Sequence, residues 1–418
     1  MLEYWFKERR TMVDFRRGPL GPFFDGLAAR LKERGYSHSA GTSILAKGCL
    51  FNSFLIEQGI TRCKMITPAH VEMFLDASLA DIRTASQGYS PRIYVRGVLK
   101  PLFSYLTEVG ALKAIKPKPT PTPYRWMLDP YMRYLREECE LTEGTIQQAR
   151  IRLCQFLEGL GEGVTRKGMK LLRAEVIDTY VKQHLKESPD NLRRLAGTLR
   201  RFLRFCARRG YVAKDFSGVI PSIPSYRLAT LPKGMEESSL QRILDVIPKD
   251  TAAGVRDYAI MLLMMAYGVR GKSVAELLLE DIDWPHSTIR IRARKGGKEV
   301  VLPLLEAVGE AIIRYLHHRP ESSPREVFLS VRAPFFPLSS CDVSAIIHRH
   351  MTKAGVKMPG GGSNTLRHSW AIRALAQDSP MKAIADVLGH RCLNTTFIYA
   401  KADLKSLRQV VMPWPKGR

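Results

Sequence analysis

The alternation of apolar and polar positions is clearest in the last part of the chain, where it predicts a helix and a hairpin. Residues 257–267 are apolar on nearly every side, which predicts a buried helix, and Gly268 follows where that helix should end. Residues 288–294 alternate between apolar and basic side chains, which is typical of a half-buried strand. Two consecutive glycines then turn the chain, so residues 299–304 are expected to return as a second strand.

Mostly helices are expected after this hairpin. Ser379 and Pro380 are predicted to open one of them, as an N-cap followed by a proline in the first turn. Asn394 is predicted to cap the next helix, which carries Tyr399. The fold class that we expect is therefore mostly α with a small antiparallel sheet.

A helix further upstream separates apolar from basic side chains. Its apolar stripe consists of Leu192, Leu195, Leu199, Phe202, Leu203 and Cys206. The arginines that fall largely on another face are Arg193, Arg200, Arg204 and Arg208. A run of charge is usually a solvated surface, but arginines at helical spacing repel one another unless an anion is present. We therefore expect this face to bind a polyanion.

Two proline-rich stretches interrupt the helical patterns, at residues 114–126 and 220–234, and are typical of extended linkers. They predict three domains. Residues 1–116 and residues 124–220 should each form a helical domain, and residues 233–418 should form an α+β domain that contains the hairpin.

The first two domains share a sequence pattern at an offset of about 100 residues. The matching positions are Gly97, Leu99 and Gly110 in the first domain and Gly197, Leu199 and Gly210 in the second. Two copies of one helical design would explain the match, although two amphipathic helices can also converge on it by chance.

Charge narrows the choice of partner. The 418 residues include 65 Lys and Arg against 40 Asp and Glu, for a net charge of +25. Such an excess favours a polyanion, with nucleic acid first and an anionic membrane surface second. The longest apolar run, residues 259–267, is far shorter than the ~20 residues that a bilayer requires, so we expect no membrane association.

Cysteine usage points to a reducing compartment. The seven cysteines form no CxxC pair, and the first residues are charged and have no apolar signal segment. We therefore expect free thiols in the cytoplasm, and neither a metal nor a cofactor.

Four motifs of the C-terminal domain resemble, in order and spacing, those of the tyrosine recombinase (phage integrase) family. They are YGVRGKSVAELLLEDIDW, RKGGKEVVLPL, NTLRHSW and LGHRCLNTTFIYAK. The resemblance assigns the catalytic positions to Arg270, Lys295, Asn364, Arg367, His390 and Tyr399. It covers nearly all of residues 233–418 and, more loosely, residues 124–220 as the core-binding domain of the family. The polyanion expected at Arg193, Arg200, Arg204 and Arg208 is then DNA.

Elementary chemistry supports that set. Arg270 and Arg367 can grip phosphate oxygens bidentately and keep their charge, which stabilises an anionic transition state without a metal ion. Tyr399 would attack the phosphodiester, and Lys295 can protonate the deoxyribose oxygen that leaves. His390 would bond the phosphate or assist proton transfer. The resemblance implies a covalent 3′-phosphotyrosyl intermediate that a DNA hydroxyl can reverse without ATP.

Two positions depart from the family pattern. Asn364 stands where the family has a histidine, and an amide can donate a hydrogen bond but cannot exchange a proton near neutral pH. Ser273 stands where an acidic residue is usual, with Glu276 further along. Because of these two departures, the family pattern does not identify the residue that acts as general base. His368, next to Arg367, can be interpreted as a supporting residue or as a buried, hydrogen-bonded histidine.

The resemblance also implies assembly. A short amphipathic helix at residues 404–411 begins a tail of the kind that docks on a neighbouring protomer in this family, so we expect a dimer or tetramer on DNA; packing on its own domain is the alternative. The N-terminal domain resembles the additional DNA-binding or assembly domains of integrases and transposon-borne recombinases.

The expected function is site-specific DNA recombination that integrates or transposes a mobile element. A type IB-like topoisomerase with the same active site is one alternative. A DNA-binding accessory protein with weakened catalysis is the other.

Overall fold

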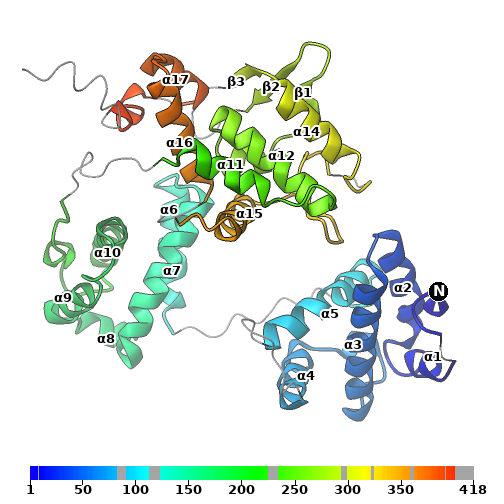
Figure 1. Cartoon of the computed structure of the whole chain (residues 1–418). Helices are drawn as coiled ribbons and strands as arrows, with labels where there is room; N and C mark the ends of the chain where they lie inside the picture. Colours follow the sequence, from blue (N-terminus) through cyan, green and yellow to red (C-terminus); the bar gives the residue numbers. More distant parts are fainter. Residues whose placement is uncertain are drawn as a thin grey trace, which may run out of the picture. The chain divides into compact units, whose positions relative to one another are not determined.

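The computed structural model describes residues 1–7, 9–81, 91–112, 123–224, 234–292, 299–321, 324–357, 362–390 and 392–400 (Figure 1). Residues 116–227 form one compact unit, and residues 1–115 are grouped with residues 228–418 in the other. Separate hydrophobic clusters form within the N-terminal, the middle and the C-terminal described residues. The three domain boundaries inferred from the proline-rich stretches stay a prediction.

The N-terminal part is helical. Its helices are α1 (Arg9–Phe15), α2 (Phe24–Glu33), α3 (His38–Glu57), α4 (Pro68–Asp81) and α5 (Pro91–Glu108). Helix α3 packs against α5, and the two enclose a core in which Phe51, Leu55 and Leu99 are fully buried. Burial of these large apolar side chains supplies the main stabilisation of the bundle.

The unit of residues 116–227 is also helical. It consists of α6 (Arg125–Glu137), α7 (Glu143–Gly159), α8 (Arg166–Lys170), α9 (Ala174–Gln183) and α10 (Pro189–Arg208). The Ser188 side chain caps α10 by accepting a hydrogen bond from the Asn191 N–H. All six residues of the predicted apolar stripe on α10 are buried, so that prediction is confirmed.

Helices α5 and α10 end in the same way. Gly110 and Gly210 follow them in the left-handed conformation, with φ of 70° and 67°. In each case the next N–H donates back into the last turn, from Ala111 to Leu106 at 2.9 Å and from Tyr211 to Cys206 at 2.8 Å. The two matched glycines therefore have the same role in both helices, while a shared design of the two domains stays a prediction.

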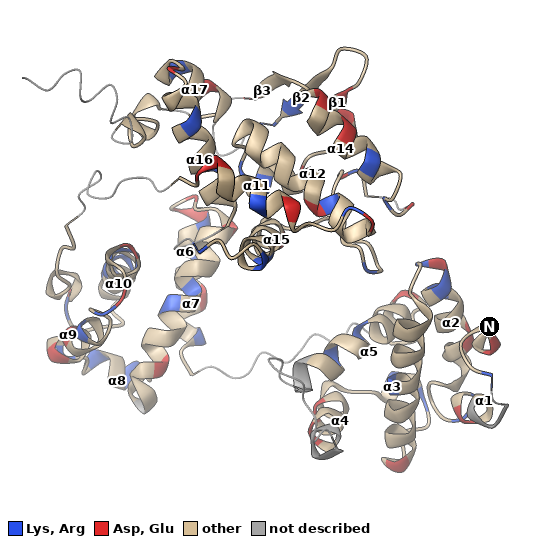
Figure 2. Cartoon of the chain, viewed as in Figure 1, with Lys and Arg blue, Asp and Glu red and all other residues tan. Residues whose placement is uncertain are grey.

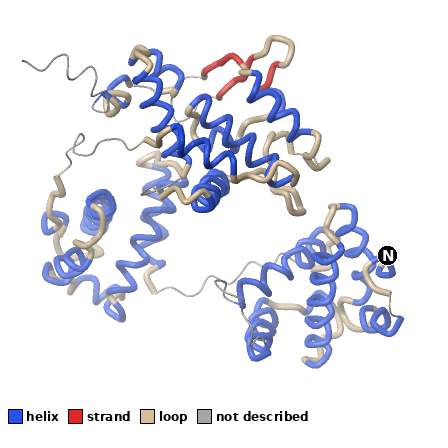
Figure 3. The backbone as a smooth tube through the Cα atoms, viewed as in Figure 1, coloured by secondary structure: helices blue, strands red, loops and turns tan. Residues whose placement is uncertain are grey.

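The C-terminal part carries a small sheet among helices (Figure 3). Strands β1 (Ile282–Asp283), β2 (Thr288–Ile291) and β3 (Val300–Pro303) are antiparallel in that order, with Ile289 opposite Leu302. The helices are α11 (Glu237–Asp245), α12 (Ala252–Tyr267), α13 (Gly271–Ala275), α14 (Glu306–Leu316), α15 (Ser340–Lys353), α16 (Ser363–Ala376) and α17 (Met381–Val387). The predicted hairpin is confirmed over its described residues, and the short β1 adds a third strand.

Helix α12 lies at the centre of the C-terminal part. It is buried along most of its length, as predicted, and packs against both α14 and α16. Gly268 ends it in the left-handed conformation, with φ of 61°, because the chain must turn there toward α13.

Side chains of α16 satisfy the carbonyls at the end of α12. The bonds run from Arg367 to Gly268 at 2.8 Å, from Trp370 to Ala266 at 2.7 Å and from Arg373 to Met265 at 2.7 Å. The last carbonyls of a helix have no partner within it, so these side-chain donors satisfy them, in addition to the backbone cap from the Gly268 N–H to Met264. The position of α16 is therefore fixed by hydrogen bonds as well as by apolar packing.

Two predicted caps are wrong. The N-cap of α17 is Pro380 rather than Ser379, and no side chain caps that helix. Asn394 lies inside a short 3-10 helix, Leu393–Thr395, whose N-cap is Cys392. Tyr399 follows in a series of turns rather than in a helix, because the N–H groups of Tyr399 and Ala400 bond three residues back.

Gly268→Ala is expected to lower the free energy of unfolding of the C-terminal part by ~1–3 kcal/mol. Alanine strains this backbone, and its Cβ would lie 2.9 Å from the Trp370 ring. Gly355 has a φ of 68° but no heavy atom within 4 Å of a Cβ, so Gly355→Ala is the matched control that carries backbone strain alone. Urea unfolding followed by circular dichroism compares the two. Equal losses would show that Trp370 does not constrain Gly268.

Candidate active site

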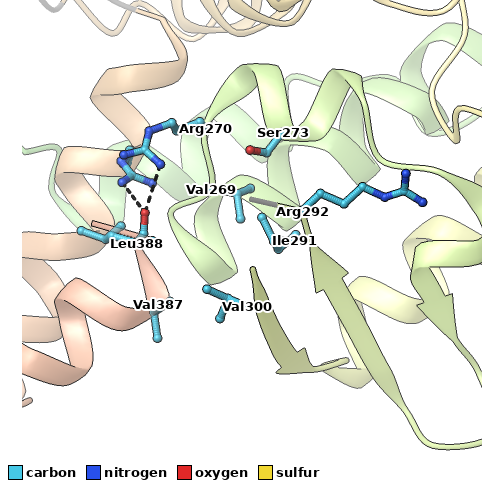
Figure 4. Close-up of a pocket in the computed structure, with 10 residues that line it drawn as sticks. Val269, Arg270, Ser273, Ile291, Arg292, Val300, Val387 and Leu388 are labelled. Carbon is cyan, nitrogen blue, oxygen red and sulfur yellow. Dashed lines mark hydrogen bonds between the residues drawn. The ribbon is translucent and has the colours of Figure 1, made fainter. Parts of the chain in front are cut away.

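Two arginines from separate elements converge on one backbone carbonyl. Arg270 is the N-cap of α13, and Arg367 lies within α16. The Arg367 Nη2 donates to the Leu388 carbonyl oxygen at 2.7 Å, and the Arg270 Nη1 donates to the same oxygen at 3.3 Å. Figure 4 draws both bonds, which end at Leu388. The structure thus brings together the two arginines that the motifs select.

Helix ends explain why the guanidinium groups lie there. Leu388 is the C-cap of α17 and Gly268 is the C-cap of α12, so both carbonyls belong to helix termini with partial negative charge. Arg367 bridges the two termini, because its Nη1 donates to Gly268 while its Nη2 donates to Leu388. The buried cation therefore has charge complementarity on two sides before any ligand binds.

The two arginines repel each other across this site. Burial, and then the charge of Arg270, lower the pKa of Arg367 to about 10. Arg367 still remains a cation at neutral pH. An anion bound between the two guanidinium groups would relieve the repulsion and would accept charge-assisted hydrogen bonds.

A recess of the surface adjoins the arginine pair. It is lined by Arg270, Arg367, Ser273 and Arg292, together with apolar residues. Arg292 donates to Asp281 at 2.8 Å and points away from Arg270 in Figure 4. Ser273 stands at the position where the family has an acid. It therefore contributes a small neutral side chain to the recess that Arg270 and Arg367 line.

Tyr399 lies buried beside the same helix ends. Its side chain is 1% exposed and packs in a cluster with Leu375, Ile384 and Leu388. The hydroxyl is 2.8 Å from the His368 Nδ1. Burial raises the pKa of Tyr399, and the nearby Arg367 and Arg270 oppose that shift only in part. The phenol is therefore protonated at neutral pH and needs a proton acceptor to become a nucleophile.

His390 is held by its own neighbouring turn. Its Nδ1 lies 2.7 Å from the hydroxyl of Thr396, a residue with no exposed surface. Burial, followed by the charges of Arg367 and Arg270, lowers the pKa of His390 to about 4. The imidazole is consequently neutral under ordinary conditions, and it acts as a hydrogen-bonding group rather than as a cation.

The remaining predicted positions differ in how they relate to this centre. Asn364 is exposed in the first turn of α16, three residues before Arg367 and therefore near it on the helix surface. Lys295 lies outside the described residues. His368 contacts Tyr399, a role that the motifs did not assign to it. Its position one helical turn after Asn364 was the feature of the sequence that could have placed it near the site.

The described residues contain no group of three His, Cys, Asp or Glu side chains that could hold a metal ion. Among the helices of that same part of the chain, none is long and apolar enough to cross a bilayer.

The arginines of α10 divide into two groups. Arg193 donates to Asp190 at 2.6 Å and to the Pro224 carbonyl at 3.2 Å. Arg200 donates to the carbonyl oxygens of Ile220 and Pro221. These two side chains therefore hold the segment that follows α10 against the helix.

The other α10 arginines are exposed. Arg201, Arg204 and Arg208 line a groove beside Tyr134, and Arg200 lines the same groove although its guanidinium group bonds backbone carbonyls. Arg204 also donates to the Ser217 hydroxyl at 3.2 Å. Sequence reasoning selected Arg204 and Arg208 but missed Arg201. Arg201 precedes Arg204 by about one helical turn and lines the same groove. Figure 2 marks the Lys and Arg positions in blue.

Comparison with known proteins identifies relatives of this chain. The sequence model of the phage integrase family matches residues 233–405. The chain is 31% identical over 424 residues to y4rF of Sinorhizobium fredii, assigned by name as an integrase/recombinase, covering 100% of this chain and 96% of the relative. It is 31% identical over 234 residues to the tyrosine recombinase XerA of Pyrococcus furiosus, covering 51% of this chain and 80% of XerA.

Two solved structures share the fold. A lambda integrase dimer bound to a COC′ core site aligns with a TM-score of 0.53 at 16% identity, over 70% of this chain and 98% of that one. The XerH site-specific recombinase bound to a palindromic difH substrate aligns with a TM-score of 0.52 at 16% identity, over 70% and 97%.

The chain therefore belongs to the phage integrase family. Within that family it is a tyrosine recombinase, a site-specific enzyme that acts on DNA. The expected fold class, mostly helical with a small antiparallel sheet, is confirmed.

The two arginine groups of α10 should respond differently to neutralisation. Replacing Arg201, Arg204 and Arg208 together with Gln is expected to flatten the log–log dependence of DNA affinity on salt by up to ~3 units, about one for each phosphate contact. Arg193→Gln with Arg200→Gln is the matched control, which should change the slope less because these side chains bond backbone carbonyls. Fluorescence anisotropy across salt concentrations measures both. A larger effect from the control pair would place the DNA against Arg193 and Arg200.

Proposed function

We propose that this recombinase cuts DNA with Tyr399 and that Arg270 and Arg367 hold the scissile phosphate. The observation that carries the proposal is the convergence of both arginines on Leu388, whose side chain packs in the cluster around Tyr399. A phosphate that replaces the Leu388 carbonyl would offer the guanidinium groups a full negative charge instead of a partial one. The cations and the phenol then act on one phosphodiester.

In the proposed reaction the Tyr399 oxygen bonds to phosphorus while the bond from phosphorus to the 5′ oxygen breaks. The arginines stabilise the charge that develops on the nonbridging oxygens. Thr396 occupies the His390 Nδ1, so Nε2 is the nitrogen available to the phosphate. Lys295, by the resemblance, protonates the leaving oxygen. The 3′-phosphotyrosyl bond stores the energy for religation, so ATP is not needed.

Double-stranded DNA is the partner, and assembly on it is part of the proposal. We expect a dimer or tetramer formed through the tail of residues 404–418, which lies outside the described residues. The lambda integrase and XerH structures were both determined on DNA, which supports this view. We further propose that the protein integrates or transposes a mobile element and acts in the cytoplasm.

Tyr399→Phe is expected to bind DNA with unchanged affinity and to form no covalent adduct, because the variant lacks only the attacking oxygen. The measurement is trapping on a nicked recombination site, with peptide mapping of the adduct. Arg270→Ala is the companion variant: it keeps the nucleophile and should slow adduct formation at least ~10²-fold, the scale for one lost transition-state donor. An adduct formed by Tyr399→Phe would show that another residue is the nucleophile.

A separate assay distinguishes a recombinase from a topoisomerase. A recombinase exchanges strands between two sites, whereas a topoisomerase only relaxes supercoiled DNA.

Asn364→Ala is expected to reduce the cleavage rate by about 10- to 10²-fold, the effect of losing one hydrogen bond to a charged group. Asn364→His should stay active and gain a pH dependence near the imidazole pKa, because its donor count changes there. Single-turnover cleavage across pH tests both variants. An inactive wild type that histidine restores would instead favour the accessory-protein alternative.

A further inference from the structure

We propose that His368 is the general base that takes the proton from the Tyr399 hydroxyl. The inference rests on the proposed role of Tyr399 as the nucleophile. It assigns the proton-accepting step to a residue outside the set that the family motifs select.

The geometry brings the imidazole onto the reacting atom. The His368 Nδ1 lies 2.8 Å from the Tyr399 oxygen, and the two rings are tilted by 56° with centroids 5.6 Å apart. This distance lies within the range that direct proton transfer requires. Helix α16 supports both groups of the site, because consecutive positions direct Arg367 to the helix-end carbonyls and His368 to the phenol.

The protonation states fit an acceptor. Burial, and then the charge of Arg367, lower the pKa of His368, whereas burial raises the pKa of Tyr399. Both groups are neutral near pH 7, so the phenol donates to Nδ1 and the imidazole carries its own proton on Nε2. The other charged or titratable groups that act on this pair are Arg270 and His390.

The neighbouring side chains are poorer acceptors. Asn364 cannot take a proton, and it is exposed at the start of α16. The Nδ1 of His390 is already engaged with Thr396, and a pKa of about 4 makes its imidazole a weak base. Arg367 and Arg270 are cations. Within the described part of the site, His368 is therefore the group that can accept the proton.

The proton is expected to move as the bond to phosphorus forms. A phenol with a raised pKa does not ionise readily to an imidazole with a lowered one, so prior deprotonation is unfavourable. As the Tyr399 oxygen bonds to phosphorus it loses its affinity for the proton, which then passes to His368. The negative charge of the phosphate stabilises the imidazolium. In religation Lys295, which by the resemblance gave up its proton in the first step, takes the proton of the DNA hydroxyl as that oxygen attacks phosphorus. The tyrosine oxygen departs, and His368 returns its proton to it.

The first test is His368→Gln, which keeps a hydrogen-bond acceptor near the phenol but cannot take a proton. Single-turnover adduct formation on a nicked site should fall ~10²- to 10⁴-fold, the contribution of a general base, with DNA affinity unchanged. A rate within about threefold of the wild type would overturn the inference.

A second substitution separates proton transfer from positioning. Incorporating 2,3,5-trifluorotyrosine at position 399 lowers the phenol pKa, so that cleavage depends less on a base. Fluorination should raise the cleavage rate of His368→Gln by a factor at least ~10 times larger than the factor by which it changes the rate of the enzyme with His368. The scale follows because one pKa unit corresponds to a tenfold change. Equal effects in the two backgrounds would show that His368 only orients the phenol.

The wild-type pH profile tests the same idea without a variant at position 368. Protonated His368 cannot accept a proton, so the cleavage rate should fall with decreasing pH below the ordinary histidine range. The pKa of His390, about 4, places its titration lower still. A rate that is independent of pH down to that region would contradict the inference. Absence of any wild-type adduct at Tyr399 would instead refute the proposed function, which keeps the two failures distinguishable.

Discussion

The bridge that Arg367 makes between the C-terminal ends of α12 and α17 is the interaction on which the rest of this site depends. One buried guanidinium donates to the carbonyl oxygens of Gly268 and Leu388, and so ties together two helices that are distant in sequence. The residue that fixes the scaffold is also the residue proposed to meet the phosphate. Catalysis and folding therefore compete for the same donors, and phosphate binding must replace at least part of a structural contact.

This arrangement also explains why positive charge can be concentrated before DNA arrives. An unpaired buried cation is costly, but the carbonyl groups at helix termini supply partial negative charge without a carboxylate. A carboxylate in the same place would neutralise Arg367 and weaken its attraction for phosphate. The neutral Ser273 in the recess fits the same requirement. The dipoles of the helix ends thus hold the arginines ready for an anion. A phosphate can displace these carbonyl groups from the arginines more easily than it could displace a carboxylate.

Much of the fold could be read from the sequence, because the strongest signals are local. The burial of α12, the left-handed Gly268 and the apolar stripe of α10 follow from periodicity and from glycine alone. The site residues came from motif order, which says nothing about contacts. The bond from His368 to Tyr399 joins residues 31 apart, and the carbonyl of Leu388 carries no side-chain signal at all. The N-caps predicted at Ser379 and Asn394 were wrong, because a residue's preference for the cap position does not fix where a short helix begins.

If Tyr399 is the nucleophile, its depth bears on how the protein selects DNA. With 1% of its surface exposed, Tyr399 would have to become accessible before its hydroxyl could meet a phosphodiester, and only the fraction of molecules in that accessible state would then be competent. Apparent affinity for the reactive state is reduced by that fraction. Specific sites typically bind ~4–10 kcal/mol more tightly than random DNA, enough to offset an opening penalty that random sequences leave unmet. A buried nucleophile can in this way filter DNA sequence without reading a single base.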